Sequence, residues 1–186
     1  TSLMLLKSEG MLQPYAPKGV GELDKKFVDP ASPPSWTGMD AWIAAVCYNP
    51  VEGKKNNLPI PRSWKDLTKP VYKGHVAMPN PNSSGTAYTT LATIVQILGE
   101  DAGFEFMKGL HKNINTYTKS GSAPIKAAGR GENTIGIVFL HDAVKQAVSG
   151  FPIDPMQVSV FYPGAKNLAA QMCWVFTVRK AKGRIL

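Results

Sequence analysis

Short apolar runs alternate with longer amphipathic stretches through the middle of the chain. Three of these runs have the length of buried strands: His75–Met78, Asn115–Thr118 and Thr134–Leu140. A helical pattern follows each of them. Strands that alternate with helices predict an α/β domain with a largely parallel sheet.

The first helical stretch repeats apolar residues at the spacing of one buried helix face. These residues are Leu91, Ile94, Val95 and Leu98. Gly99 is placed to end this helix, and a second helix is expected over residues 101–111. The apolar side of that second helix would consist of Phe104, Met107 and Leu110. Pro124 fits the first turn of a short helix that ends near Gly129, and another helix is expected over Asp142–Ser149.

The remaining elements are shorter. The run Trp42–Asn49 predicts one buried strand that Pro50 ends. Residues 19–34 and 51–61 are expected to form loops. Ser63 should cap a short helix over Trp64–Leu67, and a last strand is expected over Val158–Tyr162.

Small or polar clusters follow the three strands of the alternating region. They are Ser83-Ser84-Gly85-Thr86, Ser120-Gly121-Ser122 and His141-Asp142. The carboxyl ends of parallel strands share one edge of a sheet, where ligands bind. Helix N-termini at that edge favour anions, so the pattern predicts a site for a small acidic solute.

Each cluster also has a plainer interpretation. Ser84 and Ser122 could be ordinary helix N-caps with nothing bound, and the first cluster lacks the Walker-loop spacing. His141 and Asp142 could be a surface pair, or an acid and a base. Three aromatic residues could line a cleft or belong to the core: Trp36, Tyr48 and Tyr88.

Composition narrows the class of protein. With 44% apolar and 18% charged residues, the chain can bury a core. The net charge of +8 is largely a property of the end of the chain, because residues 165–186 hold five basic and no acidic residues. The remainder has 16 basic against 13 acidic residues, a charge of +3. Because no stripe of basic residues is seen elsewhere in the sequence, we do not expect the protein to bind nucleic acid.

Other chemistry finds little support. The histidines His75, His111 and His141 lack partners at metal-ligand spacing, so no metal and no cofactor are expected. Cys47 and Cys173 suit two buried thiols better than a disulfide, although both remain open. A hydrolase or transferase using His141 and Asp142 is an alternative, but the chain has no Gly-x-Ser-x-Gly elbow.

No apolar run is long enough to span a bilayer. The segment Thr1–Lys7 is not a complete signal peptide, so a mature or an internal start is expected.

Several of these segments, taken together, resemble one protein family. The segments are Pro61–Leu67, Pro70–Gly74, Pro79–Tyr88, Lys119–Pro124 and Gly136–Ala143. They are similar to bacterial ABC-transporter solute-binding proteins, in the branch that groups ferric-iron, phosphonate and sugar-phosphate binders. The resemblance covers roughly residues 9–163. After Pro163 the chain departs from the family's usual turn, which suggests a frameshift or a divergent ending.

The resemblance implies an α/β fold of the type 2 periplasmic-binding-protein class, with two lobes joined by hinge strands. Residues 1–48 would be part of the first lobe with one hinge crossing, and residues 49–158 the second lobe. Residues 159–186 would be a return segment and a divergent basic tail. The chain would therefore hold mainly the second lobe.

The resemblance also implies a function. The protein would be an exported, periplasmic monomer that binds a small anionic solute and delivers it to a membrane permease, without enzymatic activity. A phosphate or phosphonate would contact Ser83, Ser84, Gly85 and Thr86, with Ser120, Gly121, Ser122 and Trp36 nearby. His141 and Asp142 would meet sugar hydroxyls. Ferric iron is the alternative ligand, although the adjacent tyrosine pair of iron-binding members is absent at Phe139–Asp142.

Overall fold

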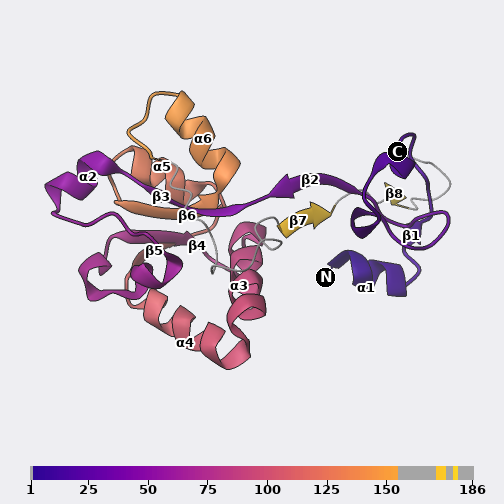
Figure 1. Cartoon of the computed structure of the whole chain (residues 1–186), viewed down its shortest axis with the longest axis horizontal. Helices are drawn as coiled ribbons and strands as arrows, with labels where there is room; N and C mark the ends of the chain where they lie inside the picture. The colour runs from indigo at the N-terminus through magenta and orange to yellow at the C-terminus, as the bar shows by residue number, and fades with distance from the viewer. Residues whose placement is uncertain (1, 155–170, 175–177, 180–186) are drawn as a thin grey trace. The chain divides into compact units, whose positions relative to one another are not determined.

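The computed structural model describes residues 2–154, 171–174 and 178–179 (Figure 1). The chain divides into two compact units: unit 1 comprises residues 1–41 and 172–186, and unit 2 comprises residues 42–171. The elements are α1 (Ser2–Ser8), β1 (Leu12–Gln13), β2 (Gly38–Trp42), β3 (Ala44–Tyr48), α2 (Pro50–Lys55), β4 (Val76–Pro79), α3 (Gly85–Leu98), α4 (Glu100–His111), β5 (Ile114–Thr118), α5 (Ala123–Gly129), β6 (Ile135–Phe139), α6 (Leu140–Val148), β7 (Gln171–Trp174) and β8 (Val178–Arg179). Within the described ranges, no helix has both the length and the apolar character needed to cross a membrane.

Unit 1 is organised around short pairings and one buried carboxylate. Strand β1 pairs with β8, and β2 pairs with β7. Asp29 is 3% exposed and accepts hydrogen bonds from Lys7 Nζ at 2.6 Å and Ser35 N at 2.9 Å. Burial by itself would raise the pKa of Asp29, but these hydrogen bonds hold it below its ordinary value. The carboxylate therefore ties α1 to the loop that precedes β2.

Unit 2 contains a four-stranded sheet in the order β3-β6-β4-β5. Strand β4 runs parallel to both β5 and β6, whereas β3 runs antiparallel to β6, with Ala44 opposite Phe139. The ends of β4, β5 and β6 and the start of β3 consequently meet at one edge, which we call the carboxyl edge. The α/β architecture and the three strands predicted from the sequence are confirmed, with boundaries shifted by about one residue.

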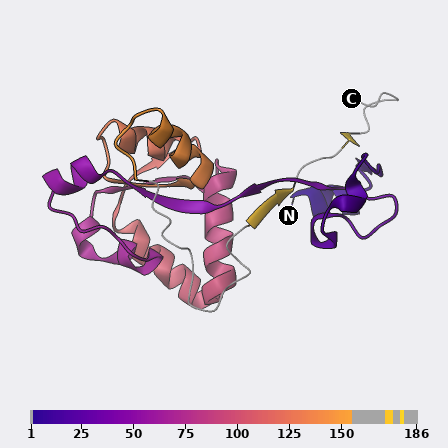
Figure 2. The ribbon, with the colours of Figure 1, turned by 45° about the horizontal axis from the view of Figure 1, so that its top comes forward.

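Helices cover both faces of this sheet, α5 and α6 on one and α4 on the other (Figures 1 and 2). Two apolar clusters fill the layers, because alternate strand residues point to opposite faces. The cluster under α3 and α4 comprises Val46, Tyr48, Leu67, Tyr72, Val76, Met78, Ala87, Leu110, Ile135 and Ile137. The cluster under α5 and α6 comprises Cys47, Ile125, Ala128, Val138, Ala143 and Ile153. Cys47 is a free, buried thiol, as predicted, and burial raises its pKa.

The prediction of one strand over Trp42–Asn49 is wrong in one respect. The segment breaks at Ile43, where β2 ends and β3 begins. The loop expected over residues 51–61 also begins with a helix, α2. Its start is fixed by Asn49, whose side chain accepts from the N–H groups of Val51 and Glu52, and Pro50 occupies the first turn.

The helix faces differ in part from the prediction. Helix α3 buries Thr86, Ala87, Thr90, Thr93 and Ile94, so most of the expected apolar face is only half-buried. In α4, Leu110 is buried, but Phe104 is 48% exposed because the neighbouring Phe106 packs against the core instead. Gly99 ends α3 with a φ of 84°, as its position predicted. The expected strand Val158–Tyr162 and the side chain of Cys173 lie outside the described part of the chain.

Candidate functional site

A compact turn carries the chain from β4 to α3. Asn80 N donates to Thr118 O at 2.8 Å, which ties the turn to β5. The carbonyl oxygen of Asn80 accepts from Ser83 N at 3.1 Å and from Ser84 N at 2.9 Å. These bonds fix Ser84 directly before the helix, at the carboxyl edge of the central strand.

The start of α3 carries donors that the protein does not satisfy. Ser84 stands at the N-cap position, as the plainer interpretation expected, but its side chain makes no capping hydrogen bond. Ser84 is 7% and Thr86 9% exposed as whole residues. Neither hydroxyl makes a hydrogen bond within the described residues, and neither oxygen is among the fully buried atoms without a partner, so both stay accessible. Tyr88 N is the first helical N–H to bond, to Ser84 O at 3.0 Å. The N–H groups of Gly85, Thr86 and Ala87 have no backbone acceptor within the described ranges, as is usual for a first turn.

Two glycines shape the space around these donors. A Cβ at Gly85 would meet no atom within 4 Å, so the first turn of α3 is open at that point. A Cβ at Gly121 would overlap the Thr86 hydroxyl and lie 3.1 Å from Ser84 Oγ. The first and second polar clusters are therefore in direct contact, as their adjacent parallel strands predicted.

The second cluster forms a tight connection between β5 and α5. Ser83 Oγ donates to Lys119 O at 3.3 Å, and Thr118 Oγ1 donates to Ser120 O at 2.9 Å. The hydroxyls of Ser120 and Ser122 lie 3.4 Å apart. Ser122 occupies the N-cap position of α5, also without a side-chain capping hydrogen bond.

The third cluster opens α6 on the other side of β4. His141 Nε2 lies 3.8 Å from Asp142 Oδ2, which is longer than a hydrogen bond. The His141 side chain is 56% exposed, and that of Asp142 26%. Asp142 lies in the first turn of α6, where a negative charge stabilises the helix.

A row of rings leads to this histidine. Trp42 and Phe139 have ring centroids 5.2 Å apart, and Phe139 and His141 have centroids 5.8 Å apart. The sequence analysis assigned Trp42 and Phe139 only to strands. Their contact depends on the antiparallel pairing of β3 with β6, for which the sequence carries no local signal.

Comparison with known proteins identifies the family. The model of the family described as bacterial extracellular solute-binding protein matches residues 1–182. The chain belongs to this family. The match passes Pro163, beyond the point where the sequence resemblance was expected to end.

Three relatives indicate what this solute-binding protein is similar to. The periplasmic binding protein AfuA from Actinobacillus pleuropneumoniae, solved with exogenous fructose-6-phosphate bound, is 39% identical with a TM-score of 0.74, over 80% of this chain and 48% of that chain. The periplasmic binding protein P5PA is 28% identical with a TM-score of 0.72, over 86% of this chain and 50% of that chain. The Fe(3+)-binding periplasmic protein of Serratia marcescens is 29% identical over 60% of this chain and 32% of its own length.

These likenesses confirm the type 2 periplasmic-binding-protein fold. The chain spans about half the length of the solved structures it matches, and less of the curated relative. Ligands and partners of those proteins therefore apply to this solute-binding protein only as proposals.

The other candidate aromatic residues have different positions. Tyr48 is a core residue whose hydroxyl donates to Leu58 O at 2.7 Å, so it is not a cleft residue at the carboxyl edge. Tyr88 is 53% exposed on α3. Trp36 belongs to unit 1.

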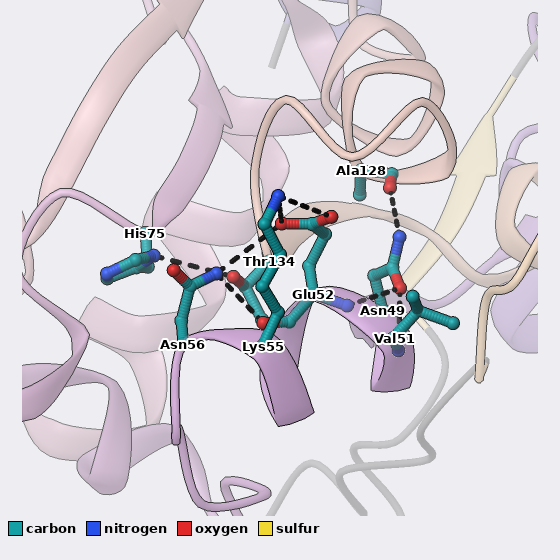
Figure 3. Close-up of polar contacts among 8 residues, drawn as sticks. All are labelled: Asn49, Val51, Glu52, Lys55, Asn56, His75, Ala128 and Thr134. Atoms are coloured by element: carbon teal, nitrogen blue, oxygen red, sulfur yellow. Dashed lines mark hydrogen bonds and ion pairs between the residues drawn. The ribbon is translucent and has the colours of Figure 1, made fainter.

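The opposite edge of the sheet holds a separate polar network (Figure 3). His75 Nδ1 lies 3.4 Å from Thr134 Oγ1, at the start of β4 and β6. Glu52 contacts Lys55 and Asn56 within and just beyond α2. His75 is therefore remote from the candidate site.

Within the part of the chain that the structure describes, no group of three or more His, Cys, Asp or Glu side chains could hold a metal ion.

Proposed function

We propose that this solute-binding protein binds a small phosphorylated or phosphonate anion for uptake through an ABC-transporter permease. The observation that carries the proposal is the pair of hydroxyls of Ser84 and Thr86 at the start of α3, which make no hydrogen bond within the described residues and are not fully enclosed by protein atoms. Both oxygens stay accessible although their residues are largely buried. An oxyanion ligand can accept hydrogen bonds from both hydroxyls and from the first-turn N–H groups at once.

The donor chemistry favours an anion with several equivalent oxygens. The free N–H groups in the first turn of α3 lie at the same place as the two hydroxyls and add further donors. The positive end of the dipole of this 14-residue helix is at that place too. These donors are neutral. Specificity would thus come from oriented dipoles in a partly buried place, where they act more strongly than in water.

The group that carries the phosphate would extend towards the third cluster. Strand β4 lies between β5 and β6, so His141 and Asp142 flank the start of α3 on the side opposite Ser120, Gly121 and Ser122. A sugar hydroxyl can donate to a carboxylate and can pair with either nitrogen of an imidazole. The relative solved with fructose-6-phosphate, at 39% identity, supports a sugar phosphate as the first ligand to test.

Delivery and location follow from the family. The relatives are named as periplasmic proteins, so we propose an exported monomer that transfers its ligand to a membrane permease without turnover. Trp36 remains our prediction for a ligand contact from unit 1. For the enzyme, Asp142 would have to orient the imidazole by a hydrogen bond to Nδ1, as in a catalytic triad. The contact found between the two side chains in the described residues is instead the 3.8 Å approach of Asp142 Oδ2 to Nε2.

Isothermal titration calorimetry tests the proposal. We expect fructose 6-phosphate, methylphosphonate or inorganic phosphate to bind the 186-residue chain, with no phosphate released from the ester. Gly85→Asp should abolish binding, because it adds bulk and like charge where the turn is open. Gly21→Asp is the matched control, because a Cβ there also meets nothing within 4 Å.

Three results would overturn the assignment. Equal binding by the Gly85→Asp and Gly21→Asp variants would remove the site from α3. A coloured Fe(III) complex without phosphate binding would favour the iron-binding relatives. Release of phosphate from the ester, abolished by His141→Ala, would make the protein an enzyme.

A further inference from the structure

Ring contacts, rather than hydrogen bonds, hold the exposed histidine of the third cluster. Among the described residues, the contacts of the His141 side chain are the Phe139 ring, with an interplanar angle of 33°, and Asp142 at 3.8 Å. The imidazole is more than half exposed, so little else restricts its rotation. Its orientation therefore depends on the ring beneath it.

Phe139 is well fixed for this purpose. It is 6% exposed, pairs with Ala44 across the sheet and lies against Trp42 at an interplanar angle of 32°. The next residue, Leu140, donates its N–H to Ile43 O at 2.8 Å. The end of β6 is thus joined to the break between β2 and β3 at Phe139 and at the residue that follows it.

We infer that Phe139 is a positioning residue that holds the His141 imidazole ready for the hydroxyl-bearing part of the ligand, with Trp42 supporting it. The inference rests on the proposed function. A preoriented imidazole loses less rotational freedom on binding than a free one. Offset and tilted ring pairs of this spacing are favourable, so Phe139 supplies orientation without using either imidazole nitrogen.

Two ligands separate this role from that of the anion donors. Inorganic phosphate reports on the donors at the start of α3, and fructose 6-phosphate reports also on His141. We expect Phe139→Leu to weaken binding of fructose 6-phosphate by about five- to tenfold and to change binding of inorganic phosphate by less than about twofold. Phe139→Tyr, which keeps the ring, should stay within about twofold of the unsubstituted chain for both ligands. Phe104→Leu, at an exposed phenylalanine of α4, is the matched control.

A double-mutant cycle shows whether Phe139 acts through the imidazole. In a His141→Ala background, Phe139→Leu should cause no further loss of fructose 6-phosphate affinity. The NMR signal of the His141 ring should also lose its ring-current shift in Phe139→Leu and keep it in Phe139→Tyr. If Phe139→Leu does not fold, Trp42→Leu, with Trp42→Phe as its ring-retaining counterpart, replaces it in the same titrations.

The possible results are distinct. An unsubstituted chain that binds neither phosphate would overturn the proposed function, and this inference with it. If the unsubstituted chain binds inorganic phosphate but Phe139→Leu weakens the binding of both ligands equally, the proposed function stands and the positioning role is overturned. Unchanged fructose 6-phosphate affinity in that variant, or additive losses in the cycle, would overturn it too.

Discussion

Asn49 Nδ2 donates a hydrogen bond of 2.7 Å to the carbonyl oxygen of Ala128, which joins the end of β3 to α5 (Figure 3). The same side chain accepts from Val51 N at 2.9 Å and from Glu52 N at 3.1 Å. Asn49 is 1% exposed. One buried amide therefore starts α2 and fastens it to a helix 79 positions further along the chain.

Asn49→Ala should lower the free energy of unfolding by about 2–3 kcal/mol, because it removes a helix cap and one further hydrogen bond. Urea denaturation followed by circular dichroism measures this change. Asn56→Ala removes an exposed amide after the same helix and should cost less than about 0.5 kcal/mol. Similar losses in the two variants would show that burial at Asn49 does not matter.

Thr86→Val should separate binding from stability. It replaces a hydroxyl that makes no hydrogen bond within the described residues by a methyl group of similar size, so the free energy of unfolding should change by less than about 0.5 kcal/mol. The affinity for inorganic phosphate should fall about tenfold, because a hydrogen bond to a charged ligand is lost. Calorimetry and thermal unfolding measure the two effects.

The control for this substitution lies on the same helix. Thr93 is also buried, but its hydroxyl donates to Thr89 O at 2.8 Å and is not in the candidate site. Thr93→Val should leave phosphate affinity unchanged. Equal affinities in the Thr86 and Thr93 variants would exclude the Thr86 hydroxyl as a ligand donor.

Gly121→Ala should impair both folding and binding. The new methyl group would overlap the Thr86 hydroxyl, and overpacking of this kind costs about 1–3 kcal/mol. Phosphate binding should be lost as Thr86 is displaced. Thermal unfolding and calorimetry of the purified variant measure both changes.

A second substitution tests the cause of that loss. Removing the hydroxyl by Thr86→Ala should restore part of the stability of Gly121→Ala, so the two effects should not add. Gly21→Ala, where a Cβ meets nothing within 4 Å, is the control. Strictly additive effects of Gly121→Ala and Thr86→Ala would show that the two residues do not interact.

Much of unit 2 could be predicted because its signals are local. Apolar runs mark β4, β5 and β6, and the polar clusters after them identify the carboxyl edge of the sheet. Gly99 marks the end of α3 through a backbone conformation that favours glycine. Helix α2 also has local signals, Asn49 and Pro50, but the lysines and asparagines that follow were interpreted as a loop.

The contacts that define the candidate site could not be predicted in the same way. The approach of Gly121 to Thr86 needs the β4–β5 register, and the ring contact of Trp42 with Phe139 needs the β3–β6 pairing. Both pairings join distant segments and are decided by packing of the whole sheet. The sequence likewise left open whether the Ser84 side chain caps α3 or faces a ligand, because residue type alone does not show whether a hydroxyl turns back to its own helix.

The stability of the short 3-10 helix Trp64–Thr68 should depend on pH through Asp66. Ser63 caps this helix, as predicted, and forms a capping box with Asp66, whose Oδ2 accepts from the N–H groups of Arg62 and Ser63, each at 2.9 Å. Lys69 Nζ lies 2.6 Å from Asp66 Oδ1. The hydrogen bond from Lys69 is the main cause that lowers the pKa of Asp66 to about 2. Burial opposes this effect, and the bonds from Arg62 and Ser63 add to it.

Because the pKa of Asp66 is lower in the folded than in the unfolded chain, the stabilisation is complete above about pH 4. It should then be lost as the pH falls towards 2. Asp66→Asn should lower the free energy of unfolding by about 1 kcal/mol at pH 7, since the partner Lys69 is largely exposed to solvent. The difference should shrink to a small fraction of that value as the pH falls through 2, as measured by urea denaturation across this range. Glu105→Gln removes an exposed pair with Lys108 at the same spacing, and its stability curve should run parallel to that of the unsubstituted chain. An Asp66→Asn deficit that persists undiminished at pH 2 would assign the effect to helix geometry instead of charge.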